Sequence, residues 1–137
     1  MELIKLIRTA KRIYLIGNGG SYANAAHVAT DLLASGILAY VIDGANLSRL
    51  ANDYGWEEVF AKWLRVVAEP GDLLIAFSGS GTSPNILRGI EEAEKIGMTV
   101  WREFGVAQGL GMQAAEERQV WLGHDLRRAL EYGDECR

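Results

Sequence analysis

Cysteine is almost absent from this sequence of 137 residues: Cys136 is the only one, so no disulfide can form within the chain. Basic residues are scattered, in runs of no more than two such as Lys11-Arg12, and the formal net charge of -4 gives no electrostatic basis for binding nucleic acid. No apolar stretch reaches membrane-spanning length, and the N-terminal residues lack the apolar core of a signal peptide. These absences predict a cytoplasmic protein that has neither nucleic acid nor membrane as a partner.

The composition is that of a folded domain. Apolar residues make up 49% of the chain and charged residues 23%, which argues against disorder. A chain of 137 residues can bury a real hydrophobic core but is too short for two independent cores. We therefore expect residues 1–137 to form a single domain.

Short apolar runs followed by turns of small polar residues organise the chain. Ile13–Gly17 and Leu73–Gly79 each lead through such a turn into a segment of helical character, which is typical of buried strands in a parallel sheet. Further strands are predicted at Ile37–Asp43 and Met98–Phe104. Helices are predicted at Ser21–Ser35, Trp56–Ala68, Thr82–Ile96 and Met112–Tyr132. The pattern predicts an α/β fold with a small, doubly wound parallel sheet.

The two turns fall where ligands bind in such sheets, at the carboxyl ends of the strands. The first, Gly-Asn-Gly-Gly-Ser at 17–21, lets the main chain approach a ligand closely. The second, Ser-Gly-Ser-Gly-Thr-Ser at 78–83, offers hydroxyl groups and free amides at the start of a helix. These groups favour an anion, and since the loop has no lysine, we predict a phosphate monoester held by neutral donors.

Neither turn is a nucleotide-binding motif. The second lacks the Walker pattern, and Tyr22 stands where the dinucleotide fingerprint requires its last glycine, so no nucleotide cofactor is expected. The alternative interpretation is that these small residues only cap helices.

With these motifs the sequence resembles the sugar isomerase (SIS) domain family, most closely its phosphoheptose isomerase branch. The matching stretches include "GNGGSYANAAHVATDLL", "NLSRLANDYGWEEVFAKWL" and "GDLLIAFSGSGTSPNILRGIEEAEKIGMTV". The resemblance implies a three-layer α/β/α, flavodoxin-like fold. It also implies conversion of sedoheptulose 7-phosphate to D-glycero-D-manno-heptose 7-phosphate, often with zinc, by homodimers or homotetramers whose sites lie between chains.

The resemblance also implies which residues form the site. A phosphate-binding loop would comprise Ser78, Gly79, Ser80, Thr82 and Ser83. Contacts to the sugar would come from Asn18, Gly19, Gly20, Ser21, Asn52 and Asp53. The histidine and carboxylate of the first long helix would be His27 and Asp31, and the catalytic histidine of the last helix would be His124.

The spacing of the ionisable residues directs them away from the core of their own domain, toward solvent or another subunit. His27 and Asp31 are four residues apart, so on a helix they share a face, which we expect to lie opposite Ala25, Ala29, Leu32 and Leu33. His124 points away from the apolar stripe formed by Ala115, Leu122, Leu126 and Ala129. The alternative is that these polar residues simply face solvent.

An aldose–ketose conversion needs a base, an acid and a group that polarises the carbonyl. We predict Asp31 as the base, His124 as the acid, and a metal or Asn52 as the polarising group. A Zn²⁺ site is predicted from His27, Asp31, Glu116 and His124. Glu117 is the alternative to Glu116, because it shares the face of His124 better.

Three departures from the family pattern are visible. Asp31 stands where the family has glutamate, which is one methylene longer; about one strand is missing after Phe104; and the segment before Ile13 is short. The domain is thus predicted to be truncated at both ends relative to the family. Two rival functions follow: a non-catalytic phosphosugar sensor and a protein-interaction module.

Overall fold

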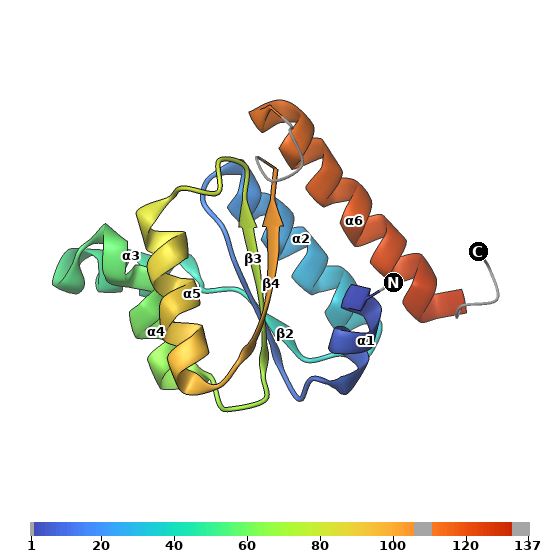
Figure 1. The fold of residues 1–137 in the computed structure, drawn as a ribbon, viewed down its shortest axis with the longest axis horizontal. Coiled ribbons are helices and arrows are strands. Elements are labelled where there is room, and N and C mark those ends of the chain that lie inside the picture. Colours follow the sequence, from blue (N-terminus) through green and yellow to red (C-terminus); the bar gives the residue numbers. More distant parts are fainter. Residues whose placement is uncertain (1, 106–110, 133–137) are drawn as a thin grey trace.

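The computed structural model describes residues 2–105 and 111–132, in which a four-stranded sheet separates two layers of helices (Figure 1). The strands, all parallel and in the order β2-β1-β3-β4, are β1 (Ile13–Ile16), β2 (Ala39–Tyr40), β3 (Leu73–Ser78) and β4 (Thr99–Phe104). The helices are α1 (Glu2–Thr9), α2 (Gly20–Ala34), α3 (Gly44–Tyr54), α4 (Val59–Val67), α5 (Pro84–Ile96) and α6 (Met112–Tyr132), with a 3-10 turn at Trp56–Glu58. This architecture confirms the predicted doubly wound α/β fold.

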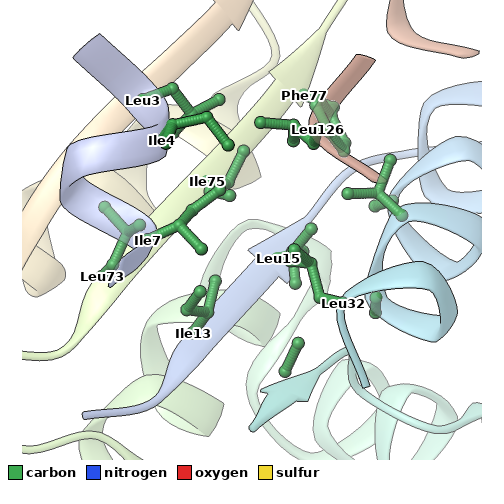
Figure 2. Close-up of a cluster of buried hydrophobic side chains, with 14 residues drawn as sticks. Leu3, Ile4, Ile7, Ile13, Leu15, Leu32, Leu73, Ile75, Phe77 and Leu126 are labelled. Carbon is green, nitrogen blue, oxygen red and sulfur yellow. The ribbon is translucent and has the colours of Figure 1, made fainter. Parts of the chain in front are cut away.

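The central strands β1 and β3 are buried along their whole length, which explains their unbroken apolar sequences. Side chains alternate between the two faces of a strand. Ile13 and Leu15 of β1 therefore join Ile75 and residues of α1, α2 and α6 in one apolar cluster (Figure 2). Tyr14 and Ile16 point to the opposite face, where they pack with α4 and α5. Each layer of helices thus has its own core.

The pairing of β1 with β3 places the two predicted ligand loops side by side. Ile16 lies opposite Ala76, so both strands end at the same edge of the sheet. The loop that leads from β1 into α2 and the loop that leads from β3 into α5 leave this edge together (Figure 1). This is the edge at which open parallel sheets bind ligands.

Two helices, α1 and α3, were not placed by the sequence analysis. Helix α3 contains no buried residue, although Leu47, Leu50 and Ala51 recur at helical spacing and pack partly against the core. The sequence analysis also predicts that about one strand of the family pattern is missing after Phe104. That prediction concerns a segment that includes residues 106–110, which lie outside the described residues. Among the described helices, none is both long and apolar enough to span a bilayer.

Glu92 of α5 is a buried carboxylate held by two arginines. Arg65 Nε donates to it at 3.0 Å and Arg88 Nη1 at 3.1 Å. The hydrogen bond from Arg65, helped by that from Arg88, lowers the pKa of Glu92 below its ordinary value, although burial acts in the opposite direction. Because the folded-state pKa is lowered, this group stabilises the fold above the unfolded-state pKa, and the contribution is lost as pH falls through the folded-state value.

We predict that Glu92→Gln lowers the free energy of unfolding by about 1–3 kcal/mol at pH 7, because the variant breaks two charge-assisted hydrogen bonds. The difference from the wild type should shrink as urea denaturation is repeated from pH 5 down to pH 3. Glu94→Gln is the control, since Glu94 is exposed on the same helix and pairs with the exposed Arg102. A Glu92→Gln deficit that stays constant with pH would contradict the assignment.

Candidate functional site

A small pocket lies between the two loops at the carboxyl edge of the sheet. Its volume is about 50 Å³, and it is lined by Asn18, Ser21, Phe77, Ser78, Gly79, Ser80, Ser83 and Met112. Sites that enclose a whole organic ligand are usually several hundred Å³. This pocket therefore has room for a compact group such as a phosphoryl group, and the remainder of a larger ligand would extend outside it.

The serine loop is organised by its own main chain. Ser78 is buried, and its Oγ accepts a hydrogen bond from Gly81 N at 2.9 Å. Ser80 Oγ accepts from Thr82 N at 3.2 Å and lies 3.5 Å from Ser83 Oγ. Although Ser83 occupies the N-cap position of α5, its side chain makes no capping hydrogen bond. Its hydroxyl is therefore not engaged in capping, which disfavours the interpretation that this loop only caps a helix.

Asn85, which the sequence analysis did not select, joins the two loops. It is 1% exposed, and its side-chain amide exchanges two hydrogen bonds of 2.8 Å with the amide of Asn18. Asn85 Oδ1 also accepts from Ile86 N at 2.9 Å. Asn18, predicted as a sugar contact, is thus engaged in holding the first loop against the start of α5. The sequence feature that could have indicated this role is an asparagine directly after Ser83-Pro84, at the start of a predicted helix.

Helix α6 closes the pocket from the side of α2. Met112, its first residue, lies over Gly79, where an added Cβ would come within 2.5 Å of Met112 Sδ. Further along α6, the buried side chain of Gln119 donates to Ser21 Oγ at 3.2 Å and accepts from Asn24 Nδ2 at 2.9 Å. Gln119 was also not selected from the sequence, because nothing local indicates which residue of α6 faces Ser21.

The two histidines meet where α2 and α6 run side by side. The ring centroids of His27 and His124 are 6.0 Å apart, and His27 Nε2 lies 3.3 Å from Asp31 Oδ2. Arg127 Nη1 lies 3.6 Å from Asp31 Oδ1. Trp121 packs edge-on against His124 with a centroid distance of 5.9 Å. The structure thus brings together three of the predicted catalytic and metal-binding residues.

The predicted orientation of α2 is correct for His27 and wrong for Asp31. The side chain of His27 is 53% exposed, whereas that of Asp31 is only 11% exposed, because α6 packs over this side of α2. Leu33, predicted to face the core, is 57% exposed, and Val28 is buried in its place. The apolar stripe predicted for α6 is confirmed, since Ala115 and Leu126 are buried and Leu122 and Ala129 are partly buried.

The predicted four-residue zinc set is not assembled in one chain. Glu116 lies against Gly20, two turns of α6 away from His124, where an added Cβ on Gly20 would come within 2.5 Å of Glu116 Oε1. Glu117, the alternative ligand, is exposed and accepts from Gln113. In the described residues, no group of three or more His, Cys, Asp or Glu side chains is arranged to hold a metal ion. These residues therefore do not fit a zinc ion within a single chain.

Asn52 and Asp53 lie apart from the pocket. Both are exposed on α3, which flanks the other side of the sheet from α2 and α6 (Figure 1). Arg49 Nε donates to Asp53 Oδ2 at 2.6 Å and Asn52 Nδ2 donates to Asp53 Oδ1 at 3.2 Å. The hydrogen bond from Arg49, followed by that from Asn52, lowers the pKa of Asp53. Asp53 is therefore an anion that a single chain does not direct toward the phosphate pocket.

An open groove lies along the line where α2 meets α6, and its residues Gly20 and Gln113 are chain neighbours of Ser21 and Met112, which line the pocket. Its volume is about 300 Å³, and its lining includes Gly20, Asn24, Glu116 and Val120. On α2, Gly20, Asn24 and His27 are three or four residues apart and therefore share a face of the helix. On α6, Val120 and His124 are four residues apart and share a face in the same way. The pocket, the groove and the histidine pair thus lie in succession along the two helices.

The family of the chain follows from comparison with known proteins. A family model described as the SIS domain matches residues 2–101. The chain belongs to the SIS domain family. This SIS domain is 41% identical over 102 residues to a phosphoheptose isomerase of Nitratiruptor, covering 69% of this chain, and 38% identical over 134 residues to that of Campylobacter concisus, covering 91%.

Solved structures support the same assignment. A phosphoheptose isomerase from Neisseria gonorrhoeae superposes with a TM-score of 0.83 at 26% identity, covering 94% of this chain and 80% of that one. One from Francisella tularensis gives a TM-score of 0.85 at 24% identity, which shows the shared fold. The SIS domain spans 54% of the Nitratiruptor relative and 70% of the Campylobacter relative.

Close packing of α6 on α2 depends on Gly123. An added Cβ there would come within 2.9 Å of Val28 Cγ2 and 3.9 Å of Asp31 Oδ2. We predict that Gly123→Ala lowers the free energy of unfolding by about 1–3 kcal/mol, because α6 must shift away from α2. Gly44→Ala is the control, since nothing lies near an added Cβ at the start of α3. Equal urea midpoints for the two variants would contradict the close packing.

Proposed function

We propose that this SIS domain is a phosphosugar isomerase of the phosphoheptose isomerase type. The observation that carries the proposal is the pocket of serine hydroxyls and amides at the start of α5, on the same chain as the groove between α2 and α6 and the pair formed by His27 and His124. Neutral donors at a helix N-terminus suit a phosphate monoester. The 37–41% identity to phosphoheptose isomerases of Nitratiruptor and Mycobacterium tuberculosis favours a heptose 7-phosphate among phosphosugars.

The distance along α2 fits an extended sugar. Ser21 lines the phosphate pocket, and His27 follows six residues later, so the two positions are about 9 Å apart along the helix axis. A phosphate on the last carbon of an open seven-carbon chain would place the first two carbons near the histidines. Asn24 and Glu116, which line the groove between them, would meet the hydroxyl groups of the sugar.

In this proposal Asp31 and His124 are the acid–base pair that moves a proton between the first two carbons through an enediol. His27, within 3.3 Å of Asp31 and next to His124, completes the cluster. No step of this mechanism needs zinc, because the described residues of a single chain do not form a set of zinc ligands. Zinc binding stays a prediction, and the experiment with sedoheptulose 7-phosphate tests it by adding zinc.

A non-catalytic phosphosugar sensor is the second candidate. The burial of Asp31 and its pairing with Arg127 favour this function, because a carboxylate in that position is poorly placed to reach a substrate carbon. A sensor would keep the phosphate pocket unchanged. The two candidates therefore differ in turnover and agree in binding.

The purified protein, incubated with sedoheptulose 7-phosphate with and without zinc, separates these functions when melting temperature and product are followed together. An isomerase should show stabilisation with turnover, and a sensor should show stabilisation alone. In Ser80→Ala, about ten times more ligand should be needed to reach the same rise in melting temperature. Asp31→Asn and His124→Ala should each lower turnover roughly a hundredfold and leave binding intact.

Asp125→Asn is the matched control for Asp31→Asn, because Asp125 is exposed next to His124 and pairs with Arg128. It should keep the wild-type rate. Neither stabilisation nor turnover with any sugar phosphate would refute the proposed function and leave a protein-interaction module. Wild-type rates in both Asp31→Asn and His124→Ala would refute the assigned acid–base pair.

We further propose that two or more copies assemble so that Asn52 and Asp53 of one chain complete the site of another. Support comes from their position on α3, exposed and away from the pocket of their own chain. Asp53→Asn and Ser80→Ala should each lose activity, and mixing the two variants should recover part of it, because mixed assemblies contain one intact site. Mixing Ser80→Ala with Ser78→Ala should recover nothing. Failure of the first mixture to recover activity would refute shared sites.

A further inference from the structure

We propose that Gln119 of α6 is a positioning residue for the phosphate pocket: it fixes the hydroxyl of Ser21 as a hydrogen-bond donor, so that the pocket selects the fully deprotonated, dianionic form of a phosphate monoester. This inference rests on the proposed function, since it concerns the same pocket. It assigns a role to a buried side chain that lies 98 residues from Ser21 in the sequence.

The direction of each hydrogen bond follows from one main-chain carbonyl. Asn24 Nδ2 lies 3.0 Å from the carbonyl oxygen of Glu116, which can only accept, so this side-chain atom must be the nitrogen. The same nitrogen lies 2.9 Å from the amide of Gln119 and therefore donates to its oxygen, Oε1. Nε2 of Gln119 is then the atom that faces Ser21 Oγ, at 3.2 Å, and it donates.

The Ser21 hydroxyl has one proton and two lone pairs. One lone pair is used by Gln119 Nε2, and Ser21 is 3% exposed and lines the phosphate pocket. Its proton is thus available to a group inside that pocket. Because hydrogen bonds in a chain polarise one another, the run from Asn24 through Gln119 strengthens Ser21 as a donor.

In the serine loop, too, the side-chain hydroxyls accept hydrogen bonds from the protein. Ser78 Oγ accepts from Gly81 N, so its proton stays available to a ligand. Ser80 Oγ accepts from Thr82 N and lies 3.5 Å from Ser83 Oγ, so at least one hydroxyl of this pair keeps its proton for a ligand. Three hydroxyls from two loops then present donors to one small pocket. A dianionic phosphate offers only acceptors and satisfies them all. A monoanionic phosphate carries a P–OH proton, which only a lone pair of one of these hydroxyls could accept. That hydroxyl would then have to turn its own proton away from the phosphate, so the monoanion binds more weakly.

A double-mutant cycle tests the path through Ser21, with methyl phosphate as the probe and calorimetry as the measurement. Gln119→Met should weaken binding about five- to tenfold in the wild-type background and have no effect in the Ser21→Ala background. Gln113→Met is the matched control, since Gln113 is exposed on the same helix and makes no contact with Ser21. Equal effects of Gln119→Met in both backgrounds would mean that Gln119 only supports packing, and would overturn the proposal.

Asn24→Asp is the second variant, in case the loss of Gln119 prevents folding. A carboxylate can only accept, so it should draw Gln119 Nε2 toward itself and turn Oε1 toward Ser21, which reverses the hydroxyl. The loss of affinity should again exceed threefold and should largely disappear in the Ser21→Ala background. An undiminished loss in that background would assign the effect to charge repulsion and overturn the proposal.

Comparison of methyl phosphate with sulfate tests the selectivity of the pocket. The second pKa of a phosphate monoester is about 6, whereas sulfate keeps two charges throughout the range used. From pH 7.5 to 5, methyl phosphate binding should weaken about tenfold relative to sulfate in the wild type. An unchanged ratio would overturn the selectivity. Binding of neither anion, nor of any sugar phosphate, would overturn the proposed function as well, so the two failures are distinguishable.

Discussion

The paired amides of Asn18 and Asn85 are the interaction on which the site depends. They join the loop after β1 to the first turn of α5, at the edge where β1 and β3 end together. Within residues 2–105 and 111–132, this pair is the side-chain hydrogen bonding that ties the glycine-rich first loop to the segment after the serine loop. Gly19 adds to the need for such a tie, because its φ of 55° is a conformation that few other residues adopt. Two loops that are individually adaptable thereby form one pocket of fixed shape.

Helix α6 supplies the second half of the arrangement. Its contact with α2 is close because Gly123 lies against Val28, and this closeness brings Gln119 to Ser21 and His124 to His27. Polar groups buried between two helices need partners, and Ser21 and Asn24 of α2 find theirs in Gln119 of α6. The same packing that stabilises the outer layer therefore also positions the groups that would act on a ligand.

The sequence predicted the strands and the longer helices well, because buried parallel strands and amphipathic helices have strong patterns. It also predicted that the turns at 17–21 and 78–83 follow strands of one sheet, and both leave the same edge of that sheet. It did not predict that Asp31 would be buried, because that depends on how α6 lies over α2, a contact between segments about ninety residues apart. Asn85 and Gln119 were missed for the same reason. Their functions are set by tertiary neighbours, whereas spacing along one helix reports only which residues share its face.

The composition of the pocket has a consequence for how the protein is made. Its lining begins at Asn18, near the start of the chain, and includes Met112, the first residue of the last helix. During synthesis, the growing chain therefore has no complete pocket until α6 has left the ribosome and docked. A ligand that binds in this pocket would stabilise only chains in which α6 is docked, and would leave chains without α6 exposed to proteolysis.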